Sequence, residues 1–297
     1  MAEQGLFLIT GGGAGHGATG NSVVRQLRQR KLPVRAFVHR DDARASELRA
    51  LGAEIVVGDL RDIETVRGAM RGVRRAYFLY PIREGLLEAS TIFAVAAKEA
   101  GVEAIVNMSQ ISSKAEHLSP AARQHWLSEQ VFDWSGIGMT HLRPTFFLEN
   151  LTPFTAETIR TESKIYLPFG KGQHAPVGGE DLARVVVGVL LDPQPHRAKT
   201  YIPTGPKSFS MAGMAEVFSR VLGKPVQYVD IPVEKWRQVL SRNPKLTPYF
   251  VEHLGRVAEA HQRGEFDGVT DVVQKIAGAP PKALDQFIQE NRAAFGG

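Results

Sequence analysis

The chain has 297 residues, of which 43% are hydrophobic and 23% are charged, which is enough to bury a large core in one large domain or two unequal ones. It contains no cysteine, which excludes disulfides, thiolate metal sites, iron–sulfur clusters and cysteine nucleophiles. The formal net charge is +5 without a long basic run, so the composition does not support nucleic-acid binding, although a basic surface suits an anionic ligand.

The apolar segments of the sequence are too short for a membrane anchor or a secretion signal. The first apolar run covers only residues 6–9 and has no basic flank before it, unlike a signal peptide. The apolar stretch 185–191 is far shorter than the ~20 residues that span a bilayer. We therefore expect a soluble, cytoplasmic protein without a membrane partner.

Short β-rich runs alternate with helical stretches through the first half of the chain. The predicted strands cover residues 6–10, 34–39, 54–57, 76–80, 104–108 and 139–143. The predicted helices cover residues 20–31, 41–51, 62–70, 86–100 and 119–134. This order predicts an α/β fold of the Rossmann type, a doubly wound parallel sheet with helices on both faces.

The pattern changes after Pro144. Proline and glycine become frequent, a clear helix covers 180–191, short strands are predicted at 201–203 and 226–231, and the remainder is mainly helical. We expect a sheet domain over residues 1–152 and a smaller, helix-rich lobe over 153–297, with the helix 180–192 packing back on the sheet. Composition alone suggests a lid over 163–179.

A glycine-rich turn leads from the first predicted strand into the first predicted helix. Residues 10–20 read TGGGAGHGATG. Such a turn brings backbone N–H groups and the positive helix end towards a pyrophosphate, and glycine permits the close approach. A flexible surface loop is the alternative. We expect a dinucleotide site in residues 1–152, with contacts from Thr10, Gly11, Gly15, His16, Gly17, Ala18 and Thr19.

The residue after the second strand bears on the choice of dinucleotide. An acid there would bind the ribose hydroxyl of NADH, whereas Arg40 suits the 2′-phosphate of NADPH. The neighbouring Asp41 and Asp42 blur this indication, and a solvated charge is the alternative. We expect NADPH, with NADH as the second possibility.

Two further strand ends face the same predicted cleft. Asp59, with Leu60 beside it, is expected either to accept a hydrogen bond from the adenine amino group or to cap the next helix. Tyr80 and Pro81 end the fourth strand, and we expect them near the ribose and the nicotinamide.

Several motifs in the body of the chain resemble one family. They are VRAFV at 34–38 with Arg40, VGDL at 57–60, SGIGMTHLRP at 135–144, FFLEN at 146–150 and EDLA at 180–183. Together they resemble the NmrA-like group of atypical short-chain dehydrogenases/reductases over nearly the whole chain. The resemblance implies an NAD(P)-binding Rossmann domain and a substrate lobe. It also implies that Ser109, Thr145, Phe146 and Phe147 approach the nicotinamide, with core packing as the alternative for the last three.

The sequence departs from the family and its wider class at two points. The phosphate loop is about three residues longer than usual, so which glycines touch phosphate stays open. The catalytic Tyr-x-x-x-Lys is missing, because its positions fall on Ala121 and His125 when the helix is aligned on Glu129. His125 is therefore the catalytic candidate, with titration expected near neutral pH, and a polar surface histidine is the alternative.

The remaining histidines and Arg143 give weaker indications of function. No metal-ligand spacing is found, since His253 and His261 lie about two helical turns apart. We expect Arg143 to tie the sixth strand to nearby carbonyls, and His174 to be a satisfied loop histidine rather than a ligand.

These observations predict an NAD(P)H-dependent oxidoreductase that transfers a hydride directly to a small unsaturated acceptor, such as a quinone, azo compound, imine or enone. The alternative is a non-catalytic sensor of NADP(H) that acts through a protein partner. A biosynthetic reductase or isomerase is a third possibility. A monomer or a homodimer suits each of them.

Overall fold

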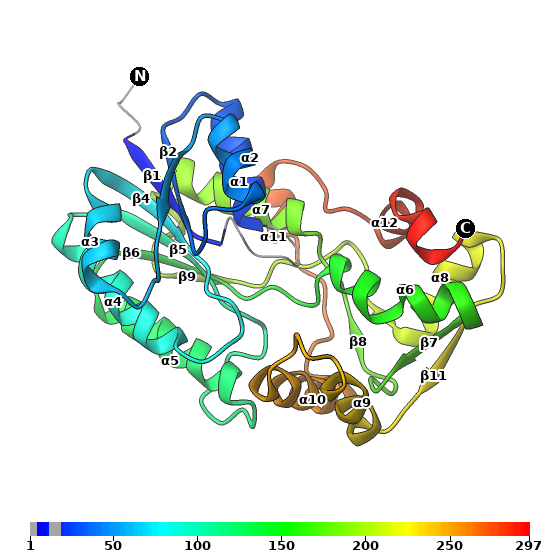
Figure 1. Cartoon of the computed structure of the whole chain (residues 1–297). Helices are drawn as coiled ribbons and strands as arrows, with labels where there is room; N and C mark the ends of the chain where they lie inside the picture. Colours follow the sequence, from blue (N-terminus) through cyan, green and yellow to red (C-terminus); the bar gives the residue numbers. More distant parts are fainter. Residues whose placement is uncertain (1–4, 12–18) are drawn as a thin grey trace.

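The structure is a computed structural model that describes residues 5–11 and 19–297. A seven-stranded parallel sheet forms the centre of one part of the molecule (Figure 1). The strand order is β3-β2-β1-β4-β5-β6-β9, and each neighbouring pair is parallel. The strands are β1 Leu6–Ile9, β2 Val34–Val38, β3 Glu54–Val57, β4 Val73–Phe78, β5 Ala104–Met108, β6 Gly138–Leu142 and β9 Lys199–Tyr201. This arrangement confirms the predicted Rossmann-type fold.

Helices cover both faces of this sheet, as strands buried on both sides require. The sheet core has two layers, one under α1, α2 and α7, with α11 packed against α7, and the other under α3, α4 and α5. In α1 the buried Val23, Val24 and Leu27 share one face of the helix, which explains its packing on the sheet. These helices are α1 Thr19–Gln29, α2 Ala43–Ala50, α3 Ile63–Met70, α4 Leu86–Glu99, α5 Pro120–Trp134, α7 Gly179–Leu191 and α11 Val272–Ala277.

The fourth strand is shifted from its prediction for a specific reason. It begins at Val73 and ends at Phe78, whereas the sequence pattern extends it to Tyr80. The backbone N–H of Leu79 donates instead to the Thr10 hydroxyl at 2.7 Å, so the ladder stops one residue before this contact. The side-chain bond thus fixes where the chain turns away from the sheet.

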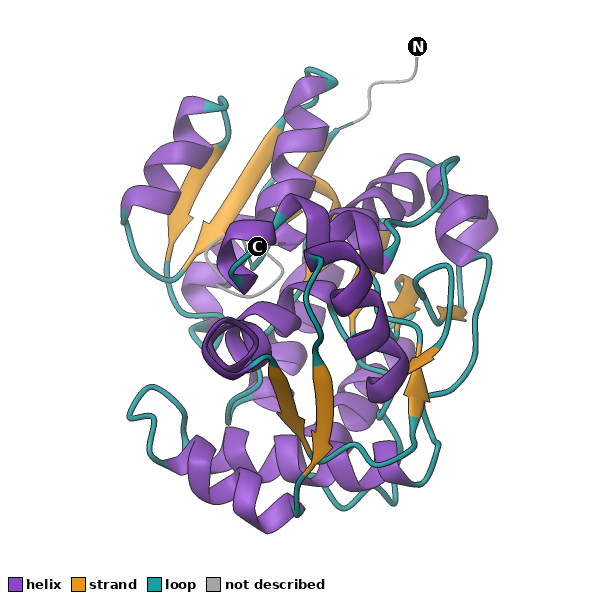
Figure 2. Cartoon of the chain, turned by 90° about the vertical axis from the view of Figure 1, so that its right-hand side faces the viewer, coloured by secondary structure: helices purple, strands orange, loops and turns teal. Residues whose placement is uncertain are grey.

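A second hydrophobic core contains side chains from Leu148 to Phe295. Figure 1 shows the elements that build it to one side of the sheet, and Figure 2 views the molecule from that side. It is built by α6 Leu151–Glu162, α8 Met211–Leu222, α9 Val233–Ser241, α10 Pro248–Gln262 and α12 Leu284–Glu290. Short strands complete it, and they are β7 Lys164–Leu167, β8 Gln173–His174, β10 Phe209–Ser210 and β11 Gln227–Asp230. Three 3-10 helices cover Leu148–Asn150, Gln194–His196 and Arg292–Phe295.

The segment 151–179 differs from its prediction. Helix α6 was not predicted, and its Pro153 lies in the first turn, where proline is tolerated. The expected lid over 163–179 instead forms β7 and β8. Its side chains Ile165, Leu167 and Phe169 are buried in the second core, so the segment is packed rather than exposed.

The chain passes between the two cores repeatedly. Helix α7 packs against α1, and β9 joins the edge of the sheet beside β6, although both follow residue 152. Helix α11 then returns to pack on α7. The division at residue 152 stays a prediction. No helix in the described part of the chain is both long and apolar enough to cross a membrane.

Candidate functional site

The carboxyl ends of the parallel strands meet at one edge of the sheet, where open α/β folds bind ligands. The order reverses at β1, because β2 lies on one side of it and β4 on the other. The predicted glycine turn leaves β1 at this switch point. Gly15, His16, Gly17 and Ala18 lie outside the described residues.

The described flanks of the glycine turn are tightly built. Gly11 has φ +74°, where side chains are strained, and a Cβ there would lie 2.9 Å from the side chain of Leu79. A Cβ on Gly20 would lie 2.5 Å from the carbonyl oxygen of Thr10. These contacts explain why glycine is required where β1 meets α1.

The two threonines of the turn are buried. The Thr10 hydroxyl donates to the carbonyl of Leu79 at 3.0 Å and accepts from its N–H, so this side chain holds β1 against the end of β4. Thr19 begins α1 at the other side of the turn. Thr10 therefore shapes the turn, and its hydroxyl proton is already used by the Leu79 carbonyl.

Arg40 follows β2 and is exposed. The two acids beside it are engaged elsewhere, since Asp41 pairs with Arg49 at 3.1 Å and Asp42 caps α2 while pairing with Arg44. The Arg44 hydrogen bond lowers the pKa of Asp42. Arg40 makes no hydrogen bond or ion pair to a described residue, so its guanidinium remains available to an anion.

Asp59 follows β3 and pairs with Arg61. The carboxylate accepts from Arg61 Nη2 at 2.8 Å and from its backbone N–H at 3.0 Å, and these bonds lower the pKa of Asp59 to about 2. The expectation that Asp59 caps the next helix is wrong, because Asp62 is the N-cap of α3. Leu60 packs in the core under α3 and α4.

Tyr80 and Pro81 follow β4. The Tyr80 ring is buried, its hydroxyl donates to the Glu84 carbonyl at 3.2 Å, and the Arg83 guanidinium lies 5.2 Å from the ring centroid. Pro81 is exposed. The structure thus gives this strand end an aromatic wall with a cation beside it.

Ser109 follows β5 at the same edge. Its backbone N–H donates to Leu142, but its buried hydroxyl has no hydrogen-bond partner among the described residues. The side-chain amide nitrogen of Gln110 is also buried without a hydrogen-bond partner among these residues. Buried polar groups are normally paired, so these two atoms indicate a place where a ligand would contribute partners.

Glu129 and Arg143 join α5 to the end of β6. Glu129 is 2% exposed and accepts from the Arg143 side chain and from the Ser113 hydroxyl. This ion pair raises the pKa of Arg143. Arg143 ties the end of β6 to its surroundings, as expected, but the expected partner is wrong. Arg143 pairs with the buried carboxylate of Glu129 rather than with carbonyls.

Thr145, Phe146 and Phe147 lead from β6 towards the second core. The Thr145 hydroxyl donates to the Ala175 carbonyl at 2.6 Å. Phe147 packs against the sheet core and Phe146 against the second core, where its ring lies 5.1 Å from His174. The predicted core-packing alternative therefore describes much of what these side chains do.

His125 is buried in the second turn of α5. Burial lowers its pKa to about 4, although the nearby Glu129 charge opposes this shift. The expectation of titration near neutral pH is therefore wrong, and so is the alternative of a surface residue. Its ring makes no hydrogen bond to a described residue.

The structure adds residues that sequence analysis missed. His117, Ser119, Tyr249 and His253 lie where α10 packs on α5. The Tyr249 hydroxyl is buried without a partner in the described part of the chain, and burial raises its pKa. No motif marks these residues. The only hint is that Tyr249 and His253 are four apart and so share a helix face.

His174 and His261 form a buried pair in the second core. His261 Nε2 lies 2.6 Å from His174 Nδ1, and Phe169 stacks on His261 with ring centroids 4.4 Å apart. Burial lowers the pKa of His261 to about 4. The described residues contain no group of three possible ligands able to hold a metal ion.

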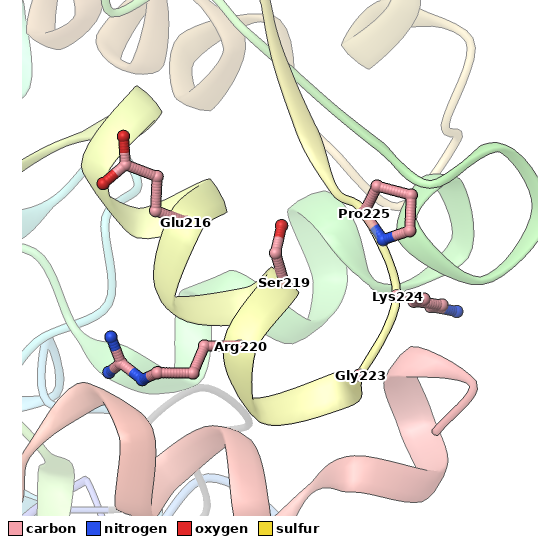
Figure 3. A pocket seen from close by; sticks show the side chains of 6 residues that line it. All are labelled: Glu216, Ser219, Arg220, Gly223, Lys224 and Pro225. Carbon is pink, nitrogen blue, oxygen red and sulfur yellow. The ribbon is translucent and has the colours of Figure 1, made fainter.

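A shallow pocket of about 510 Å³ lies elsewhere, at the carboxyl end of α8 (Figure 3). Two of its polar side chains are already engaged, because Ser219 bonds to the backbone of Val226 and Lys224 donates to the carbonyls of Phe295 and Gly296. It lies on the side of the second core away from the sheet (Figure 1). We assign it no role.

Comparisons with known proteins agree with this architecture. The NmrA-like family model matches residues 6–288, and the chain belongs to this family. It is 32% identical over 293 residues to the NAD(P)H azoreductase of Xenophilus azovorans, covering 98% of this chain and 99% of that protein.

Two solved structures share the fold. The NADPH complex of the NADPH-dependent quinone oxidoreductase from Escherichia coli is 22% identical, with a TM-score of 0.84 and coverage of 96% of this chain and 99% of that one. The NAD complex of NmrA, a negative transcriptional regulator, is 17% identical, with a TM-score of 0.81 and coverage of 97% and 95%. The fold thus occurs in both an enzyme and a regulator.

Proposed function

We propose that this protein is an NAD(P)H-dependent oxidoreductase that prefers NADPH and reduces a small unsaturated acceptor. The observation that carries the proposal is the switch-point turn between β1 and α1, with Arg40 at the next strand end and no unpaired acid beside it. Residues 1–152 would bind the dinucleotide, and residues 153–297 would supply most of the acceptor pocket.

The residues at the sheet edge fit a dinucleotide. Glycine at positions 11 and 20 keeps side chains out of the turn, as close approach of a pyrophosphate demands. Arg40 would bind the 2′-phosphate through several donors. The orphaned Ser109 hydroxyl would gain a partner. The remaining proposed contacts are Thr10, Gly11, Thr19, Asp59, Leu60, Tyr80, Pro81, Thr145, Phe146 and Phe147.

The chemistry follows from what the chain lacks as well as from what it holds. When bound, the reduced nicotinamide supplies a hydride, and a proton from water completes the two-electron reduction of the acceptor. Ala121 stands where a catalytic tyrosine is expected, so the protein's part is to align the reactants and exclude water. Acceptors such as quinones need little acid assistance. The activities named for the azoreductase relative and the quinone oxidoreductase support this class of acceptor.

The test is the oxidation of NADPH, followed by its absorbance, across a panel of quinones, azo dyes, imines and enones. We expect turnover with at least one quinone or azo compound, and tighter calorimetric binding of NADPH than of NADH. The variant Arg40→Ser tests the phosphate contact, and Arg67→Ser is its control, because Arg67 pairs with Glu64 and Glu99 on α3 and α4. Absence of turnover above the enzyme-free rate with every acceptor would contradict the proposal.

A sensor of NADP(H) is the second candidate. The buried, low-pKa His125 and the missing tyrosine favour it, and the fold is shared with a transcriptional regulator. This candidate predicts binding of NADPH and NADP⁺ without turnover, together with a partner protein whose affinity changes with their ratio. Both outcomes are measurable with the same preparations.

A further inference from the structure

Three buried histidines from separate segments gather at the start of α5. His117 lies in the loop after β5, His125 in α5 and His253 in α10, and they are 6%, 5% and 3% exposed. His253 interacts electrostatically with both of the others. Helix α10 lies beside α5 in Figure 1 and contacts it. The second core thus adds a third imidazole to two that follow the carboxyl end of β5, where ligands bind in such folds.

Ser119 fixes the orientation of two of these rings. Its backbone N–H donates to His117 Nδ1 at 3.0 Å, and its hydroxyl lies 2.8 Å from His253 Nδ1. The same hydroxyl caps α5 by accepting from the Ala122 N–H at 3.3 Å. The backbone N–H makes His117 Nδ1 an acceptor. The hydroxyl proton of Ser119 is not used by the helix cap, and we assign it to His253 Nδ1.

A neutral imidazole with an accepting Nδ1 carries its proton on Nε2. Burial keeps these rings neutral at pH 7, since it lowers the pKa of His117 and lowers that of His253 to about 3. The Nε2 of His117 is buried, and neither it nor the Nε2 of His253 has a hydrogen-bond partner among the described residues. His117 therefore presents an Nε2–H without an acceptor among the described residues, and His253 presents a second when its Nδ1 accepts the Ser119 proton.

We propose that His117 and His253 donate hydrogen bonds from Nε2–H to the oxygen or nitrogen of the bound acceptor on which negative charge develops during reduction, and that Ser119 positions both rings. This inference rests on the proposed function. The arriving hydride forms a new bond to the acceptor and moves an electron pair onto that heteroatom. The two imidazoles keep their protons, and water supplies the proton that completes the product. Preorganised neutral donors stabilise such charge without changing protonation state.

Paired substitutions separate the donor from the ring's structural role. In His253→Gln the amide nitrogen reaches the position of Nε2, whereas in His253→Asn the amide reaches only Nδ1 and can keep the Ser119 bond. We expect His253→Asn to lower kcat/KM by about 100-fold, the loss typical of one oxyanion donor, and His253→Gln to stay within a few-fold of wild type. The same pair at His117 should behave likewise.

The acceptor series distinguishes a donor from a packing residue. We expect the loss in His253→Asn to grow across substituted benzoquinones as the hydroquinone becomes a weaker acid, and to be largest with an azo dye. His261→Asn removes another buried imidazole from α10 and is the matched control. This variant should change kcat/KM by the same factor for every acceptor. NADPH binding and thermal unfolding of each variant check that the fold is kept.

Nitrogen NMR of ¹⁵N-histidine provides a readout besides activity. We expect Nε2–H tautomers at His117 and His253 in the wild type, and a mixture at both after Ser119→Pro removes the backbone donor and the hydroxyl. His141 is an internal reference, because its Nδ1 accepts from Asn107 at 3.1 Å and its Nε2 lies 2.9 Å from Asp133. A proton on Nδ1 of either ring in the wild type would overturn the inference.

The outcomes also separate this inference from the proposed function. A wild type that oxidises NADPH beside an equally active His253→Asn variant, across the whole acceptor series, would overturn the donor role alone. A wild type that reduces no acceptor would overturn the proposed function and the donor role with it.

Discussion

The carboxyl edge of the sheet and the contact between α5 and α10 supply candidate site residues in different ways. At the edge, Arg40, Asp59 and Tyr80 directly follow strands, so local sequence determines where they lie. At the α5–α10 contact, Ser119 and His253 are hydrogen-bonded although 134 residues separate them in the chain. The comparison teaches that the proposed cofactor half of the site is determined locally, whereas the proposed acceptor half is assembled by tertiary packing.

The largest change in stability should follow from removing Arg143, which joins α5 to the end of β6 by tertiary packing. Arg143→Ala leaves the carboxylate of Glu129 buried without its cationic partner, and we expect a loss of about 3–5 kcal/mol in the free energy of unfolding. Urea denaturation measures it. Arg67→Ala is the control, because its partners Glu64 and Glu99 are exposed and its loss should stay within about 1 kcal/mol. Equal losses in the two variants would contradict the assignment.

Lowering the pH should destabilise the part of the molecule that tertiary packing assembles, because buried histidines of α5 and α10 lie there. Burial lowers the pKa of His125 to about 4, of His253 to about 3 and of His261 to about 4. The unfolded chain, with histidine pKa near ~6.5, binds protons first as pH falls, so stability is complete above that value and is lost towards about pH 4. Each histidine should contribute roughly 1.4 kcal/mol per pH unit in this window.

The measurement is urea denaturation at pH 7.5 and pH 5. We expect His261→Asn to depend on pH less steeply than the wild type by about the contribution of one histidine. A His261→Asn variant with the wild-type slope would show that burial does not hold this ring neutral.

The smallest expected effect is on cofactor binding by Arg40, whose position directly after β2 is determined by local sequence. Arg40→Ser should raise the KM for NADPH by about tenfold, equivalent to about 1.4 kcal/mol, and leave the KM for NADH unchanged, because only NADPH carries the 2′-phosphate. Steady-state kinetics with a quinone acceptor measure both constants. Equal changes for the two cofactors would place Arg40 outside the phosphate site.

How much the sequence predicts follows the same division. Strand–helix alternation predicted the sheet, and Arg40, Asp59, Tyr80 and Ser109 follow their strands at the expected edge. The burial of His125 could not be predicted, because it depends on how α5 packs in the folded chain, including against α10, more than a hundred residues later. The Arg143 partner was missed for a similar reason, since Glu129 faces it only after α5 packs on β6. The side-chain bond from Thr10 to Leu79 likewise has no pattern in the sequence.

The repeated passage of the chain between its two cores limits how the molecule can move. After β6 the chain enters the second core, returns for α7 and β9, leaves for α8, returns for α11 and ends in α12. A single backbone cleavage therefore cannot release either half as an intact unit. Any swing of one core against the other would have to bend all of these connections together.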